Sequence, residues 1–311
     1  MSKLLQEYKF KGKYNALKYL LLIVIVLTSL CANMPNLPFL NVPSQSVTSG
    51  IEASNEDIYV NVNALPTEVS GGGSITLYFQ IMNKANYNLE DVSLNLYDPC
   101  VFNNGESKEN PIGPLKPNRT SSWSWPLQSD IITLNRDCEL KFTVSYKGKF
   151  TFYQDVAVLS QPEYNTRLLQ GTLKNIPITS SFSSSPLQIF PTFTEEQPLL
   201  DGSNYDMKIN YAYAGNGFIN VTDVEIKVPD NLQVSSCKDY TGTGTLSLNK
   251  ILKFINKKAS SSLCTFTTKA SQLIDIKSLT ITATYIYTID SSVPVTVKGT
   301  STSQPSTGTS G

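Results

Sequence analysis

Hydrophobic and polar residues alternate with a period of two along most of the chain from residue 57 onward. In Ile58-Tyr59-Val60-Asn61-Val62 the side chains change character at every step, which is the period of a half-buried β-strand. The same pattern, rich in β-branched and aromatic residues, recurs at 74–81, 92–97, 140–146, 187–190, 206–212, 224–228, 251–255, 279–286 and 293–297. Turn residues such as Gly71-Gly72-Gly73 and Lys147-Gly148-Lys149 interrupt it, and no stretch keeps a helical spacing over three turns. The pattern predicts an all-β fold of antiparallel sandwiches.

The expected strands form two blocks that resemble each other. Residues 57–160 and 185–298 each predict one immunoglobulin-like sandwich, with 161–184 as the linker between these tandem domains. Phe142-x-Val144-x-Tyr146 is followed ten residues after its tyrosine by Val156-x-Val158. Ile281-x-Ala283-x-Tyr285 is followed at the same interval by Val295-x-Val297, and Phe142 and Ile281 are 139 positions apart. The spacing favours an internal duplication, although unrelated sandwich domains can share such spacings.

A basic segment and an apolar run precede the β region. Residues 1–18 carry five lysines and one glutamate, and residues 19–34 carry no charge. Because lysine-rich flanks stay in the cytoplasm, we expect a cytoplasmic tail at 1–18 and a transmembrane anchor or signal segment at 19–34. The apolar run would span about 24 Å against a hydrocarbon core of ~30 Å, so a cleaved signal peptide remains an alternative. The polar residues 35–56 predict a stalk and the Ser/Thr-rich residues 299–311 a disordered tail, which together indicate a single-pass plasma-membrane protein whose bulk is extracellular.

Composition and charge exclude several classes of function. The chain has 25 basic residues, 25 acidic residues and no histidine, so it can form neither a Ser-His-Asp triad nor a histidine-ligated metal site. Zero net charge gives no reason to expect a nucleic-acid partner. Adjacent carboxylates at Glu90-Asp91 and Glu195-Glu196 would point to opposite faces of a strand, which does not suit glycoside hydrolysis. We therefore expect no enzyme and no catalytic residue, and keep an extracellular hydrolase only as an alternative.

Cysteines and sequons also indicate an extracellular location. Each block holds two cysteines, Cys100 and Cys138 in the first and Cys237 and Cys264 in the second, which predicts one disulfide per block. No C-x-x-C motif is present, so zinc is not expected. Sequons for glycosylation begin at Asn118 and Asn220.

Aromatic residues and loop carboxylates are the remaining candidates for binding. Trp123 and Trp125 lie on one face of an expected strand, where they could bind a partner or, as we favour, pack in the core. Tyr213 is a further candidate for a surface contact. No cofactor is expected except, as a weaker alternative to solvated turns, calcium at loop residues. The residues concerned are Asn55, Glu56, Asp57, Asp201, Asp230 and Asn231.

The first block resembles a known family of surface domains. Pro66, Gly71, the long strand at 75–81, Asn83 and the strand opening with Val92 are similar to the CARDB-like, immunoglobulin-related domains of archaeal membrane-anchored surface proteins. The resemblance covers about 57–160, and extends less fully to 185–298. It implies a structural, adhesive or scaffold role at the cell surface, with membrane, surface proteins and glycans as partners. The alternative is a glycan- or protein-binding accessory subunit of a membrane complex.

Overall fold

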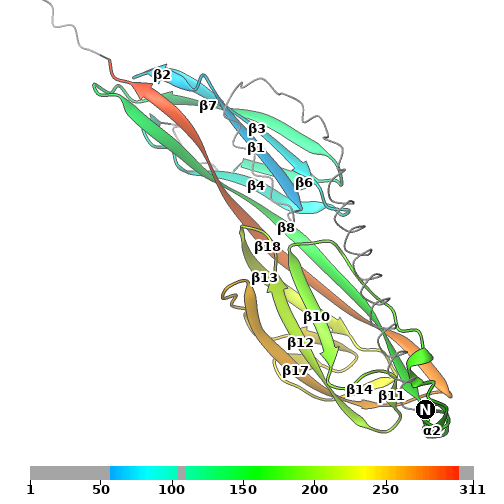
Figure 1. Ribbon diagram of the computed structural model, residues 1–311. Helices are drawn as coiled ribbons and strands as arrows, with labels where there is room; N and C mark the ends of the chain where they lie inside the picture. The colour runs from blue at the N-terminus through cyan, green and yellow to red at the C-terminus, as the bar shows by residue number, and fades with distance from the viewer. Residues whose placement is uncertain (1–56, 104–109, 301–311) are drawn as a thin grey trace, which may run out of the picture. The chain divides into compact units, whose positions relative to one another are not determined.

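The computed structural model describes residues 57–103 and 110–300, and most of these residues lie in β-strands (Figure 1). The sheets are almost entirely antiparallel, which confirms the predicted all-β class. The expected tail at 1–18, anchor at 19–34 and stalk at 35–56 lie outside the described residues, as does nearly all of the tail at 299–311. Among the described residues, no helix has the length and hydrophobicity that a membrane span requires.

The strands follow one another in two similar series. The first series is β1 (Ile58–Leu65), β2 (Glu68–Ser70), β3 (Ser74–Asn83), β4 (Leu89–Asp98), β5 (Phe102–Asn103), β6 (Asn110–Leu115), β7 (Thr120–Ser129) and β8 (Arg136–Leu159). A connecting segment holds helix α2 (Gln161–Gln170), the 3-10 turn η1 (Leu173–Asn175) and β9 (Ser180–Phe182). The second series is β10 (Leu187–Phe193), β11 (Leu199–Leu200), β12 (Asn204–Tyr213), β13 (Phe218–Lys227), β14 (Leu232–Cys237), β15 (Tyr240–Gly242), β16 (Thr245–Leu248), β17 (Lys258–Thr268) and β18 (Ile274–Lys298).

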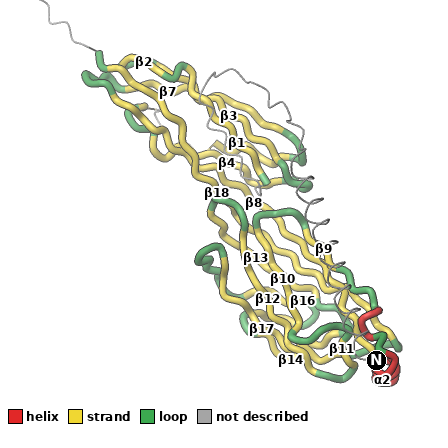
Figure 2. Tube along the Cα trace, in the orientation of Figure 1, coloured by secondary structure: helices red, strands yellow, loops and turns green. Residues whose placement is uncertain are grey.

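These strands form one large sheet and two small sheets (Figure 2). The first small sheet has the order β1-β3-β7-β5, and the second has the order β10-β12-β17-β14. The large, ten-stranded sheet runs β15-β16-β13-β18-β8-β4-β6, with β2 beside β18 and with β9 and β11 beside β8.

The large sheet is built on two long strands that serve both blocks. β8 and β18 pair antiparallel over their whole length, from Arg136 opposite Val297 to Leu159 opposite Ile274. The two blocks therefore share these strands, and the predicted tandem immunoglobulin-like sandwiches are not confirmed. The alternation in β8 continues through Gly148, which was expected in a turn, because this glycine is extended and buried beneath the ring of Tyr285.

Both small sheets cover the same face of the large sheet. Every even-numbered residue of β8 from Cys138 to Phe152 is buried, as is nearly every odd-numbered residue of β18 from Leu279 to Val297. Since paired residues share a face of a sheet, this alternation defines one apolar side along the full ribbon. The side chains that pack on it from the two small sheets form one continuous hydrophobic core.

An internal two-fold repeat accounts for the shared ribbon. Lys147 pairs with Ile286, and these residues are 139 positions apart, which is the offset of the sequence repeat. A two-fold axis through this pair exchanges β8 with β18, and the first small sheet with the second. β2 pairs in parallel with the end of β18, and β11 pairs in parallel with the equivalent end of β8. Each block is thus completed by part of the other block's long strand.

Two segments differ from the expected secondary structure. Residues 251–255 form no strand: their only ladder contact is an isolated bridge between Ile255 and Lys258, and Ile251 and Ile255 are exposed. The expected linker at 161–184 contains helix α2, which has no buried residue and hence no apolar period to reveal it. Its signals are Pro162 in the first turn and Gly171 as a left-handed C-cap.

Candidate functional site

The outer face of the first small sheet carries an ordered array of polar side chains. One row across the strands is Asn63, Tyr78 and Ser124. The next row is Asn61, Gln80 and Ser122. A groove of about 400 Å³ runs over both rows, with Phe79 and Trp123 as its remaining lining. We call this the sheet groove.

The rows of β1, β3 and β7 on either side of the sheet groove carry no charged side chain. The flanking rows are Leu65, Thr76 and Pro126 on one side and Tyr59, Met82 and Thr120 on the other. At the rim, the Lys84 ammonium lies 5.1 Å from the centre of the Tyr59 ring. Sequence reasoning missed this site. The sequence does show Asn, Gln and Tyr at alternate positions of the expected strands. It does not show which of these residues lie side by side, because that depends on the register between strands.

The two tryptophans lie beneath this face. Trp123 stacks on Phe79 with ring centroids 5.4 Å apart, and the Trp125 ring lies 6.4 Å from Phe79. Both indoles are half-buried and pack against the core, as favoured from the sequence. Trp123 is also one of the residues that line the sheet groove. Tyr213, the third aromatic candidate, is half-buried and packs edge-on against Phe254 at 5.3 Å.

The cysteines pair as the sequence predicts. Cys100, in the turn after β4, is bonded to Cys138 of β8. Cys237 of β14 is bonded to Cys264, its direct partner on β17. β4 and β8 are neighbours in the large sheet, and β14 and β17 are neighbours in the second small sheet. The second disulfide therefore links adjacent strands, and the first links β8 to the turn after its neighbour β4, whereas the immunoglobulin disulfide bridges two sheets.

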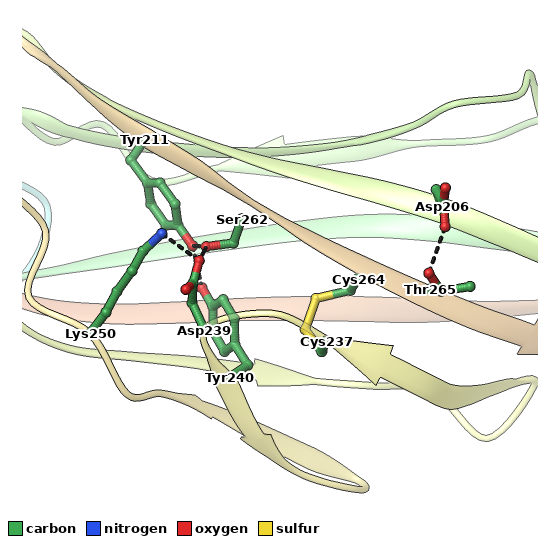
Figure 3. Close-up of a disulfide and its surroundings, with 9 residues drawn as sticks. All are labelled: Asp206, Tyr211, Cys237, Asp239, Tyr240, Lys250, Ser262, Cys264 and Thr265. Carbon is green, nitrogen blue, oxygen red and sulfur yellow. Dashed lines mark hydrogen bonds and ion pairs between the residues drawn. A yellow bond between two sulfur atoms is a disulfide. The ribbon is translucent and has the colours of Figure 1, made fainter.

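A polar cluster lies beside the second disulfide (Figure 3). Lys250 donates to Asp239 at 2.6 Å, and Ser262 donates to the same carboxylate oxygen at 3.1 Å. The hydroxyls of Tyr211 and Tyr240 are 2.8 Å apart, and Tyr211 donates to Ser262 at 3.0 Å. The hydrogen bond from Lys250 lowers the pKa of Asp239, and burial raises the pKa of both tyrosines. The chain of contacts is internally satisfied, which favours a structural role.

A second cluster surrounds Asp57, one of the calcium candidates. Asp57 is 4% exposed, and its carboxylate accepts hydrogen bonds from Tyr285 at 2.8 Å, from Tyr146 at 3.4 Å and from Tyr87. The Tyr87 and Tyr285 hydroxyls are also 2.8 Å apart. Burial raises the pKa of Tyr87 and of Tyr285. Asp57 was expected in a solvated loop, but tyrosines from distant strands enclose it.

The other described calcium candidates also have protein partners. Asp201 accepts from the backbone of Ala270 at 2.8 Å, and Asp230 forms an ion pair with Lys277 at 2.6 Å. Asn231 donates to two backbone carbonyls. Within 57–103 and 110–300, no three cysteine or carboxylate side chains gather as a metal site would require. Asn55 and Glu56 lie outside the described residues.

The acidic pairs form surface ion pairs, and both sequon asparagines are exposed. Glu90 is paired with Lys147 at 3.6 Å, and Glu196 with Lys174 at 3.0 Å. Asn118 is exposed in the turn between β6 and β7. Asn220 is exposed on β13, beside an irregularity in its pairing with β18. Both acceptor asparagines are thus accessible in the folded chain.

Comparisons with known proteins do not identify a family. No protein-family model and no curated protein matches the chain. The solved structures found include the secreted serine protease VesC from Vibrio cholerae, with 10% identity, a TM-score of 0.18, and coverage of 73% of this chain and 48% of that one. Escherichia coli alpha-2-macroglobulin activated by porcine elastase has 8% identity, a TM-score of 0.21, and coverage of 78% and 33%. Collagen adhesin (CNA) from S. aureus has 10% identity, a TM-score of 0.12, and coverage of 79% and 94%. The chain spans less than half the length of the first two, and similarities at these scores support no functional conclusion.

Proposed function

We propose that this protein is a membrane-anchored extracellular protein that presents its β-structure at the cell surface for adhesion or assembly. The observation that carries the proposal is the pair of disulfides, one in each block of a duplicated all-β fold. Structural disulfides persist in oxidising compartments, where the basic segment and apolar run of the sequence would direct and hold the chain. The exposed sequons at Asn118 and Asn220 fit the same compartment.

The shared ribbon suits a role in spacing and display. A strand the length of β8, which has 24 residues, extends for about 80 Å. Its continuous pairing with β18 resists bending between the blocks better than a flexible linker would. In this proposal each block is a variant of the immunoglobulin-like sandwich, completed by a strand from its neighbour. The resemblance to CARDB-like surface domains supports the same role.

Labelling of intact cells tests the location. The full chain is expressed in cells, which are treated with a membrane-impermeant amine biotinylation reagent before lysis. We expect the chain to be labelled, to remain with the membrane fraction, and to give no maleimide reaction at the four paired cysteines until it is reduced. A cytoplasmic protein expressed in the same cells is the control for leakage. Labelling only after permeabilisation, or four free thiols in the native chain, would contradict the proposal.

A further inference from the structure

We propose that the sheet groove binds a neutral oligosaccharide, with the Tyr78 ring as the surface on which a sugar ring stacks. The inference deepens the proposed function and rests on it, because it names a class of partner for a protein displayed outside the cell. The groove lies wholly on β1, β3 and β7, so the site is formed by three neighbouring strands of one sheet (Figure 1).

The side chains of the groove match the chemistry of a sugar ring. A pyranose has an apolar C–H face and a periphery of hydroxyls that both donate and accept hydrogen bonds. Tyr78 is 47% exposed and offers an aromatic face in the middle of its row. Asn63 and Gln80 flank it with amides, which can both donate and accept, whereas the Oδ1 atom of Asn61 is buried. Aromatic area flanked by a few polar groups is the composition expected of a small-ligand site.

The charge of the face selects the kind of glycan. The four rows across β1, β3 and β7 contain no acidic or basic side chain. A uronic acid, a sialic acid or a sulfated sugar would need a cation to offset its charge, and Lys84 at the rim is turned over the Tyr59 ring. A neutral hexose chain needs no such partner. The groove therefore fits uncharged oligosaccharides better than acidic ones.

The internal repeat supplies a comparison within the same chain. In the second small sheet, Lys208 of β12 pairs with Thr192 of β10, as Tyr78 of β3 pairs with Asn63 of β1. Tyr78 and Lys208 are each the fifth residue of a ten-residue strand with a similar pattern of burial, so Lys208 takes the place of Tyr78 in the second copy. Asp206, two residues before it, accepts a hydrogen bond from Thr265 across the same outer face (Figure 3). The two copies share a framework, but only the first presents an uncharged face with a central aromatic ring.

The groove is held in shape before any ligand arrives. β1 pairs with β3 in an unbroken register of eight residues, and β3 pairs with β7 in an unbroken register of nine. On the opposite face of these strands, the Phe79 and Trp123 rings stack on each other and pack against the core. Because the lining residues belong to paired strands, little backbone conformational entropy is lost on binding.

Intrinsic fluorescence tests the proposal directly, since the chain has two tryptophans and both lie on β7. The purified full chain, in mild detergent, is titrated with cellohexaose, maltohexaose and mannohexaose, and with oligogalacturonate as an acidic probe. We expect a saturable change in tryptophan emission with at least one neutral hexasaccharide, and at least tenfold weaker binding of the acidic probe.

Two variants assign the binding to the groove. We expect Tyr78→Ala and Asn63→Ala to weaken binding, Tyr78→Ala by about tenfold or more, without lowering the melting temperature. Tyr97→Ala is the matched control, because Tyr97 is 49% exposed on β4 of the large sheet and should leave the affinity unchanged. The inference is overturned by no saturable change with the three neutral probes up to about 10 mM, by equal binding of the acidic probe, or by full affinity in Tyr78→Ala. Any of these results leaves the surface location to be decided by cell labelling.

Discussion

Gly148 is the residue on which the middle of the shared ribbon depends. A Cβ atom at this position would lie 2.6 Å from Cε2 of the Tyr285 ring, and that ring is held by the hydrogen bond from its hydroxyl to Asp57. We expect Gly148→Ala to lower the free energy of unfolding by about 1–3 kcal/mol, because a buried ring must shift. Gly244→Ala is the control, since a Cβ there meets no atom within 4 Å. Urea denaturation measures the free energy of unfolding of both variants. Equal values would contradict the close contact between Gly148 and the Tyr285 ring.

The buried tyrosines make the fold sensitive to alkali. Burial raises the pKa of four tyrosines above the ordinary value of 10.0: Tyr87, Tyr211, Tyr240 and Tyr285. Below pH 10 these hydroxyls are neutral in both states, so their contribution to stability is fully present. Above pH 10 the unfolded chain ionises first, so stability falls as pH rises. We expect tyrosinate absorbance to rise together with loss of β-sheet circular dichroism. If these tyrosines ionised just above pH 10 while the chain stayed folded, the predicted link between their burial and stability would be wrong.

Residues differ in how far the sequence determines their surroundings. The pairing of Cys100 with Cys138 could be predicted because each block holds only two cysteines. The burial of Asp57 could not, because its partner Tyr285 is 228 positions away. For the same reason Tyr78 could be placed on a strand, but its row with Asn63 and Ser124 requires the register of three strands.

At the scale of elements, the alternation of side chains predicts where most strands lie. It does not predict the residue at which a strand ends. Gly148 between two lysines has the composition of a turn, yet β8 continues because a partner strand of equal length lies beside it. Conversely, residues 251–255 have a strand-like composition but pair only through the single bridge of Ile255 with Lys258. Strand length in a sheet is therefore set by pairing, which depends on residues distant in sequence.

The disulfides give an element-scale prediction. They close loops of 38 and 27 residues, for which the chain-entropy account gives about 3–4 kcal/mol each. We expect Cys100→Ala/Cys138→Ala and Cys237→Ala/Cys264→Ala each to lower the free energy of unfolding by that amount in guanidinium denaturation. Cys31→Ala, which changes the fifth cysteine, is the control. Double variants as stable as the parent chain would show that the bonds do not constrain the unfolded state.

At the scale of the whole molecule, the shared strands join the two copies into one thermodynamic unit. Independent tandem domains would unfold separately, but here β8 and β18 each contribute to both copies and the core is continuous. We expect one calorimetric transition for the full chain in mild detergent, with calorimetric and van't Hoff enthalpies in agreement. Two matched truncations of core side chains, one in each copy, test whether the two copies unfold together. Leu77→Ala in the first small sheet and Ile209→Ala in the second each remove a fully buried side chain, at a cost of about 2–5 kcal/mol.

Because neither copy is complete without the other's long strand, each truncation should lower the melting temperature of the whole transition. If the copies were instead autonomous, the parent chain would show two transitions, and each variant would shift only the one belonging to its own copy. Tyr285→Phe provides a third test at the ribbon itself. Its hydroxyl, from β18, bonds to Asp57 at the start of the first copy, so its loss should destabilise the single transition without splitting it. A split transition would mean that the two halves of β18 can separate, and that the ribbon is not what unites the molecule.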